Sequence, residues 1–206
     1  LVSPTTGCGG TNTITGVLDA WQDSVPVIFV SGNVNLNQIS PDGVRNLGVQ
    51  EARIVDIVKP ITKYAKLIES VDEVEEVVRE AIKQATTGRP GPVVIDVPKN
   101  LTDPNEKFEY KFPSDLYLRS FALYDKADTS DIEKAAKLLT EAERPVIYAG
   151  GGAINANAAA EVFKLGKLMG CPVTNTLMGL GVYPASDEQF IGMLGMHGTY
   201  EANNAM

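Results

Sequence analysis

Apolar runs alternate with amphipathic stretches through the first half of the chain. One stretch places its apolar side chains at the i, i+3, i+4, i+7 spacing of a helix: Ile14, Val17, Leu18 and Trp21. The apolar run at 25–31 follows it and is typical of a strand buried on both faces of a parallel sheet. Residues 1–3, which lead into a glycine-rich turn, and residues 64–68 are further predicted strands.

A second helix is predicted after residue 70, because Ser70 and Glu73 have the spacing of a capping box. The predicted buried stripe of this helix is Val71, Val74, Val78, Ala81, Ile82 and Ala85. Gly88 ends the helix, and the apolar run at 92–97 predicts another buried strand. Strands that alternate with helices imply a parallel sheet with right-handed crossovers.

The pattern fades at 98–128, and a second α/β unit follows. Aromatic residues are scattered among charges and prolines in 98–128, so we expect a linker that packs against other parts of the protein. Ser130 and Glu133 predict another capping box, with an apolar stripe at Ile132, Ala135, Ala136 and Leu139. A strand at 145–149, a helix at 156–169, an apolar segment at 172–174 and a final helix at 200–206 are predicted next. The fold class is therefore α/β, with parallel sheets flanked by helices in two incomplete domains.

Composition and charge narrow the class of protein. The 206 residues carry a formal net charge of −8, with 44% hydrophobic and 21% charged residues, which is typical of a soluble globular protein. The acidic balance argues against binding to nucleic acid, which relies on clustered Lys and Arg. No apolar run is long enough to span a bilayer, so we expect a cytoplasmic protein that does not associate with membranes. Cys8 and Cys171 lie far apart in the sequence and are expected to be unpaired thiols.

Four segments rich in glycine or methionine are candidates for ligand binding. They are Gly7-Cys8-Gly9-Gly10-Thr11-Asn12, Gly150-Gly151-Gly152, and the loops at 176–181 and 193–199. Glycine allows close approach of the backbone, and methionine packs well against a flat ring. The two loops therefore predict a wall for a large planar cofactor. The two glycine segments follow predicted strands, where ligands of open α/β sheets bind, although an ordinary turn also accounts for each.

Two single residues are candidates with an ordinary alternative. His197, the only histidine, lies between Met196 and Gly198, where it is either part of the cofactor wall or a structural histidine. Arg119 is a lone cation in the aromatic linker and either forms a surface salt bridge or contacts a cofactor phosphate or ring. A metal site and a Ser-His-Asp triad are unsupported, because the sequence has no second histidine and no Gly-x-Ser-x-Gly motif.

Motifs along the whole chain resemble the large catalytic subunit of the acetohydroxyacid synthase (acetolactate synthase) family, whose members are thiamine-diphosphate enzymes. The turn at 7–12 with Thr15-Gly16 is similar to the family's Gly-Pro-Gly-Ala-Thr-Asn turn. The other similar segments, in order, are Asp23-Ser24-Val25-Pro26, Gln50-Glu51, Gly88-Arg89-Pro90-Gly91-Pro92-Val93, Asp96-Val97-Pro98-Lys99, Arg119-Ser120, Gly150-Gly151-Gly152, 176–181 and 193–203.

The resemblance implies a division into domains and two sets of cofactor contacts. Residues 1–103 would be the C-terminal part of the pyrimidine-binding domain, 104–128 a linker, and 129–206 the N-terminal part of the central FAD-binding domain. The residues implied to surround FAD are Arg119, Gly150, Gly151, Gly152, Thr176, Leu177, Met178, Met196, His197 and Gly198. Those implied to lie near thiamine or the active-site entrance are Gly7, Cys8, Asn12, Asn33 and Gln50.

The implied reaction belongs to branched-chain amino-acid biosynthesis. Pyruvate is decarboxylated on thiamine diphosphate with Mg²⁺, and the two-carbon unit is transferred to a second 2-keto acid, while FAD is a structural cofactor. The resemblance also implies a homodimer or tetramer that a regulatory small subunit can join.

The catalytic machinery that the family requires is missing from the printed sequence. The family's activating glutamate and its Gly-Asp-Gly…Asn metal segment have no counterpart here, and neither Glu51 nor Asp42 takes their place. No catalytic residue and no metal ligand is therefore assigned. We expect a segment of a longer polypeptide that is inactive alone.

Three positions depart from the family pattern. Cys8 stands in place of a proline, Asn33 in place of a glutamine, and Val49 in place of a phenylalanine that lines the active-site entrance. These departures leave open a related thiamine-diphosphate enzyme with another acyl acceptor, for example in surface-sugar synthesis. A noncatalytic flavin-binding or assembly module on the same fold is a further alternative.

Overall fold

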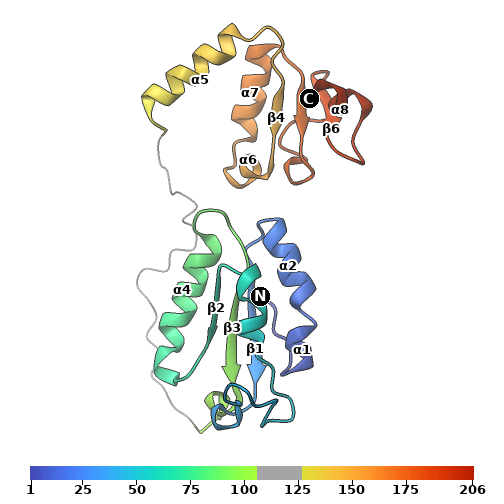
Figure 1. The fold of residues 1–206 in the computed structure, drawn as a ribbon. Coiled ribbons are helices and arrows are strands. Elements are labelled where there is room, and N and C mark those ends of the chain that lie inside the picture. The colour runs from blue at the N-terminus through green and yellow to red at the C-terminus, as the bar shows by residue number, and fades with distance from the viewer. Residues whose placement is uncertain (106–126) are drawn as a thin grey trace. The chain divides into compact units, whose positions relative to one another are not determined.

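The chain forms two compact units, Leu1–Leu123 and Tyr124–Met206, and the computed structural model describes residues 1–105 and 127–206. Each unit contains a three-stranded parallel sheet with flanking helices (Figure 1), which confirms the predicted fold class. Within the two described ranges, every helix is too short or too polar to cross a membrane.

The first unit is built on a sheet with the strand order β1-β3-β2. Its elements are α1 (Cys8–Thr11), α2 (Ile14–Gln22), β1 (Ile28–Asn33), α3 (Ile54–Val58), β2 (Tyr64–Leu67), α4 (Val74–Thr86) and β3 (Val93–Pro98). Both outer strands pair with β3 in parallel, and Ile28 and Tyr64 lie on either side of Val93. Instead of the strand expected at 1–3, a single bridge joins Val2 to Phe29.

The two faces of this sheet are covered by different helices, as Figure 1 shows for α4 on one side and α1 and α2 on the other. Successive residues of a strand point to opposite faces. Val93 and Ile95 pack with the apolar side of α4, while Val94 packs with residues of α2 and α3. These residues are nearly inaccessible to solvent, so β3 forms the centre of the core.

The capping box predicted at Ser70 is present, and the helix that follows buries part of the predicted stripe. The Ser70 backbone N–H donates to Glu73 Oε1 at 3.2 Å, and Ser70 Oγ accepts from Asp72 N–H at 3.2 Å. This cap begins a 3₁₀ turn, Val71–Glu73, and α4 itself begins only at Val74. The buried residues of α4 are Val77, Ala81 and Ala85, and Val74 packs against them partly buried. Ala81, Ala85 and Val74 agree with the predicted stripe, whereas the predicted Val78 is 37% exposed.

The predicted strand at 25–31 also begins later than expected, at Ile28. Pro26 has no N–H to donate to a ladder, and Ser24 has a φ of 60°. The chain therefore turns at 23–24, and Val27 is the first residue bonded to β3, accepting from Val93 N–H at 2.9 Å.

The second unit is built on a sheet with the order β4-β5-β6. Its elements are α5 (Thr129–Glu141), β4 (Ile147–Ala149), α6 (Gly151–Asn155), α7 (Ala159–Met169), β5 (Val173–Asn175), β6 (Phe190–Met193) and α8 (Tyr200–Ala205). All three strands run parallel, with Ile147 and Phe190 on either side of Val173. The buried core of this unit is Ala149, Val173, Val182 and Tyr183.

Three predictions for the second unit need correction. The N-cap of α5 is Asp128 and not the predicted Ser130, and the Asp128 carboxylate accepts from Ser130 N–H at 2.7 Å. The apolar stripe predicted for this helix is not buried, because no residue of α5 is buried. The triplet at 150–152 is the start of a helix: Gly150 is the N-cap of α6, and Gly151 and Gly152 are its first two residues. The sequence predicts no strand at β6, of which only Met193 falls in a predicted loop.

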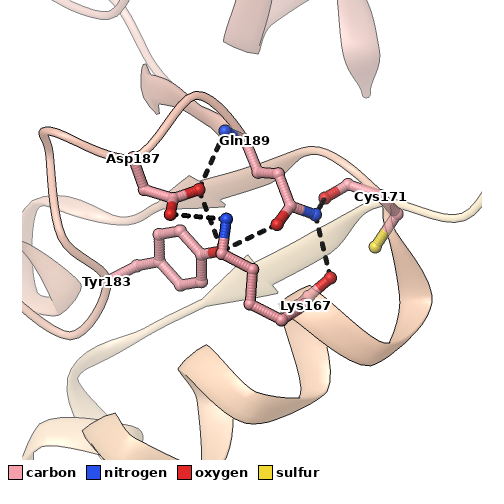
Figure 2. A network of polar contacts seen from close by, with 6 residues as sticks. Lys167, Cys171, Tyr183, Asp187 and Gln189 are labelled. Carbon is pink, nitrogen blue, oxygen red and sulfur yellow. Dashed lines mark hydrogen bonds and ion pairs between the residues drawn. The ribbon is translucent and has the colours of Figure 1, made fainter.

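A polar network fixes the segment between β5 and β6 (Figure 2). Gln189 Nε2 donates to the carbonyl oxygens of Gly166 at 2.8 Å and Cys171 at 2.9 Å, next to the end of α7. Asp187 pairs with Lys167 Nζ at 2.6 Å and accepts from Gln189 N–H at 3.1 Å. This hydrogen bonding with Lys167 lowers the pKa of Asp187.

The Tyr183 side chain packs directly against α7. Tyr183 is 1% exposed, and a methyl group at Gly166 would lie 2.9 Å from its Cε2 atom. The ring also lies 5.4 Å from the Phe163 ring, centroid to centroid. The segment is therefore attached to the helix by both apolar and polar contacts.

Candidate functional site

The first candidate site lies where β1 and β3 end, beside the glycine turn. Gly7 has a φ of 62°, and a methyl group there would lie 2.6 Å from the carbonyl oxygen of Gln50. Only glycine adopts this conformation and tolerates this approach. Thr6 Oγ1 donates to Gln50 Oε1 at 3.2 Å, so the structure brings two predicted site residues, Gly7 and Gln50, into contact.

Two other residues of the turn have exposed side chains. Cys8 is the first residue of α1, and its thiol is free and exposed. Asn12 is also exposed and follows the end of α1. The backbone of the turn is ordered beneath them, because the N–H groups of Thr11 and Asn12 donate to the carbonyl oxygens of Gly7 at 3.2 Å and Cys8 at 3.0 Å.

Asn33 is placed differently from the other predicted residues, because its amide is buried in a network within the protein. Asn33 Nδ2 donates to Asp96 Oδ2 at 2.6 Å and to the carbonyl oxygen of Ala52 at 3.0 Å. Its Oδ1 accepts from the N–H of Val34 at 2.9 Å. Ser31 Oγ donates to the other Asp96 oxygen at 2.6 Å. The Asn33 amide therefore links the end of β1 to Asp96 on β3 and to Ala52, which follows Gln50 and Glu51 in the chain.

Burial dominates the electrostatics of this network. Asp96 is 1% exposed, and this desolvation raises the pKa of its carboxyl group. The hydrogen bonds from Ser31 and Asn33 oppose the shift only in part. Sequence reasoning placed Asp96 in a motif without assigning it this role.

The second candidate site lies at the carboxyl edge of the β4-β5-β6 sheet. Thr176 N–H donates to the carbonyl oxygen of Ala149 at 2.9 Å, and Thr176 Oγ1 accepts from Gly179 N–H at 3.0 Å. A methyl group at Gly151 would lie 3.0 Å from Met178 Cβ. The structure therefore brings the triplet at 150–152 into contact with the first predicted loop.

The other predicted loop leaves the neighbouring strand at the same edge. Leu194 N–H donates to the carbonyl oxygen of Asn175 at 3.2 Å, and Gly198 N–H donates to Gly195 at 2.9 Å. Met196 is 92% exposed, and His197 is also exposed. Both side chains therefore present surface to solvent in this unit. Arg119 lies outside the described residues.

Asn175 is a residue that sequence reasoning missed. It ends β5, is completely buried, and neither polar atom of its amide has a hydrogen-bond partner among the described residues. A buried amide without partners is costly. The only signal in the sequence is an asparagine that directly follows an apolar segment.

Comparisons with known proteins match two separate parts of the chain. Residues 1–58 match the thiamine pyrophosphate enzyme N-terminal TPP binding domain, and residues 132–206 match the thiamine pyrophosphate enzyme central domain. The chain therefore belongs to the thiamine pyrophosphate enzymes.

Within that class the chain is similar to acetolactate synthase large subunits. It is 42% identical to that of Haemophilus influenzae over 98% of the chain and 39% identical to the isozyme 3 large subunit of Escherichia coli over 100%. A probable acetolactate synthase large subunit of Methanocaldococcus jannaschii is 41% identical over 98% of the chain. The chain spans 34–35% of the length of these relatives.

Proposed function

We propose that this chain is the part of an acetolactate synthase-like carboligase that contributes one side of the thiamine site and a flavin site. The observation that carries the proposal is the identity of about 40% that runs through both units to acetolactate synthase large subunits. The proposed reaction decarboxylates pyruvate and transfers the two-carbon unit to a second 2-keto acid. The proposal includes a cytoplasmic homodimer or tetramer with a regulatory small subunit as a partner.

The residues of the first unit fit the edge of a thiamine site. The backbone of Gly7 is fixed against Gln50, and the side chain of Gln50 is exposed beside it. We propose that Gly7, Cys8, Asn12 and Gln50 contact the cofactor or substrate. Asn33 would act indirectly, by holding the chain next to Gln50 through its hydrogen bond to the carbonyl oxygen of Ala52. When bound, thiamine diphosphate supplies the electron sink for decarboxylation, and this chain orients it. Within residues 1–105 and 127–206, no group of three acidic, histidine or cysteine side chains suits a metal, so we assign no Mg²⁺ ligand here.

The residues of the second unit fit a flat cofactor such as FAD. Leu177 is 67% exposed and Met178 is 43% exposed, which leaves apolar surface beside the triplet at 150–152. A methyl group at Gly152 would meet no atom within 4 Å, so this backbone is open to a ligand. We propose that these residues, with Gly150, Gly151, Thr176, Met196, His197 and Gly198, surround the flavin. Arg119, which lies outside the described residues, is proposed as a flavin contact from the family resemblance alone.

The test is product formation by the full-length protein. With pyruvate, thiamine diphosphate, Mg²⁺ and FAD we expect acetolactate, and omission of thiamine diphosphate should abolish it. Absence of acetolactate under all conditions would contradict the proposed reaction. We expect residues 1–206 alone to be inactive.

A second candidate function keeps the same chemistry but uses another acyl acceptor. Val49 is 97% exposed next to Gln50, at the position where the family pattern has a phenylalanine. Substitution of so exposed a residue leaves folding nearly unchanged. A Val49→Phe variant should therefore change the ratio of products formed from competing acceptor acids, and an unchanged ratio would remove Val49 from acceptor selection.

A further inference from the structure

Residues 34–53, which connect β1 to α3, form a loop that closes around the carboxylate of Glu51. In Figure 1 this loop lies beyond the arrowheads of β1 and β3. Glu51 Oε1 accepts from both the N–H, at 2.9 Å, and the hydroxyl of Ser40. Glu51 Oε2 accepts from Leu47 N–H at 2.9 Å. One carboxylate therefore ties two distant points of the loop to its end.

The charge of Glu51 strengthens these contacts. The hydrogen bond from the Ser40 hydroxyl, followed by those from the N–H groups of Leu47 and Ser40, lowers the pKa of Glu51 to about 2. The side chain is thus ionised near neutral pH, and each bond to it is charge-assisted. Both oxygens are occupied by donors of the loop, so this glutamate is not available as an acid or base.

The same loop end carries Gln50 and is fixed at its base. The carbonyl oxygen of Ala52 accepts from Asn33 Nδ2 at 3.0 Å. The carbonyl oxygen of Gln50 lies against Gly7, and its side chain accepts from Thr6. Glu51 stands between these two attachments. A change in its position would move Gln50 away from the glycine turn.

We propose that Glu51 is a positioning residue that orders the loop at 34–53 and holds Gln50 at the active-site entrance. This inference rests on the proposed function, because it assigns the effect to productive binding of the 2-keto acids. Glu51 does not touch the reacting atoms and acts only through Gln50. Loss of its carboxylate should therefore lower kcat/KM for the 2-keto acids and leave the affinity for thiamine diphosphate close to that of the parent.

The experiment compares Glu51→Ala with Asp42→Asn in the full-length protein. Asp42 belongs to the same loop, where its 97% exposed side chain pairs with Arg53, and such pairs contribute little. We expect Glu51→Ala to expose the Ser40 and Leu47 amides to hydrogen exchange and to lower kcat/KM about 10-fold or more, because small displacements at an active site are costly. Glu51→Asp should restore part of kcat/KM, and Asp42→Asn should change neither quantity.

Different results would contradict the ordering of the loop by Glu51, the positioning of Gln50 and the proposed function. If the Ser40 and Leu47 amides stay protected in Glu51→Ala, Glu51 does not order the loop. If protection is lost but kcat/KM is unchanged, or if the affinity for thiamine diphosphate falls equally, Glu51 does not position Gln50 for the 2-keto acids. If Glu51→Ala does not fold, Ser40→Ala, which removes one donor, decides in the same assays. A parent protein that makes no acetolactate contradicts the proposed function, while hydrogen exchange still decides the ordering role.

Discussion

Asn33 and Asp96 are joined by a 2.6 Å hydrogen bond between neighbouring strands of the first unit. Asp96 also accepts from Ser31, and all three side chains are at most 4% exposed. Replacement of Asp96 by Ala would leave the Ser31 hydroxyl and one of the two amide N–H groups of Asn33 without their acceptor. We expect Asp96→Ala to lower the free energy of unfolding by about 3 kcal/mol, measured by urea denaturation.

The same network predicts a pH dependence. Burial raises the pKa of Asp96 above its value in the unfolded chain, so the native state binds the proton more tightly. Stability from this group is therefore present at low pH and is lost as the pH rises from about 4 through the raised pKa. Asp96→Asn removes this titration, and its stability relative to the parent should increase from pH 4 to pH 7. Parallel pH profiles for the two proteins would contradict the assignment.

The contact between Gly7 and Gln50 predicts a large effect from a single methyl group. Gly7→Ala combines a φ of 62° with a clash at the Gln50 carbonyl, and we expect a loss of about 1–3 kcal/mol. Gly16→Ala is the matched control, because Gly16 lies in α2 with no atom within 4 Å of the new methyl group. The control should raise stability by up to about 1 kcal/mol. Thermal unfolding of the two variants checks both expectations.

Gln189 should stabilise the second unit through the two carbonyl oxygens to which it donates. Gln189→Ala removes both bonds and should cost about 2 kcal/mol. Gln189→Glu should cost more, because a carboxylate would face these carbonyls and Asp187. The exposed neighbour Glu188 provides a control, and Glu188→Gln should stay within about 0.5 kcal/mol of the parent in urea denaturation. Equal stability of all three variants would show that the network is dispensable.

Asn175 predicts a gain in stability from a substitution in the core. Thr is close to Asn in size and suits a strand. Asn175→Thr replaces two buried amide atoms that have no partner in the described ranges by a single hydroxyl group. We expect the free energy of unfolding to rise by about 1 kcal/mol. A decrease would mean that the amide has a partner in the protein studied.

The Gly152→Ala variant tests flavin contact in the second unit without disturbing the fold. The methyl group would meet no protein atom within 4 Å, and Ala favours a helix over Gly by about 1 kcal/mol. The thermal midpoint should therefore be equal or higher. If the flavin approaches Gly152, its affinity should fall in a fluorescence titration. Unchanged affinity would remove Gly152 from the proposed site.

The sequence predicted the elements whose signals are local. The helix at 14–22, the strand at 93–98 and the cap at Ser70 all follow from spacing or from neighbouring residues. The strand β6 was missed because Phe190–Met193 is short and contains Gly192, and its pairing with β5 depends on distant residues. Val78 was misplaced because positions 77 and 78 both lie three or four residues from Val74 and Ala81, and spacing alone does not decide which of the two enters the core.

The candidate sites show the same limit. The glycine and methionine segments were recognisable as motifs, and the structure groups those of the second unit at one sheet edge. The bond from Asn33 to Asp96 joins residues that are 63 positions apart, and nothing local indicates it. The role of Glu51 in its loop likewise depends on Ser40 and Leu47, which no spacing rule connects to it.

The close contact between Gly166 and Tyr183 has a consequence for how this sequence can diverge. A side chain at 166 would need the space that the Tyr183 ring occupies, because the nearest ring atom lies only 2.9 Å from the position of a methyl group. The two positions therefore share one volume between a helix and a segment that follows in the chain. Over evolutionary time a larger residue at 166 should be accepted only together with a smaller one at 183, so the pair should change in concert.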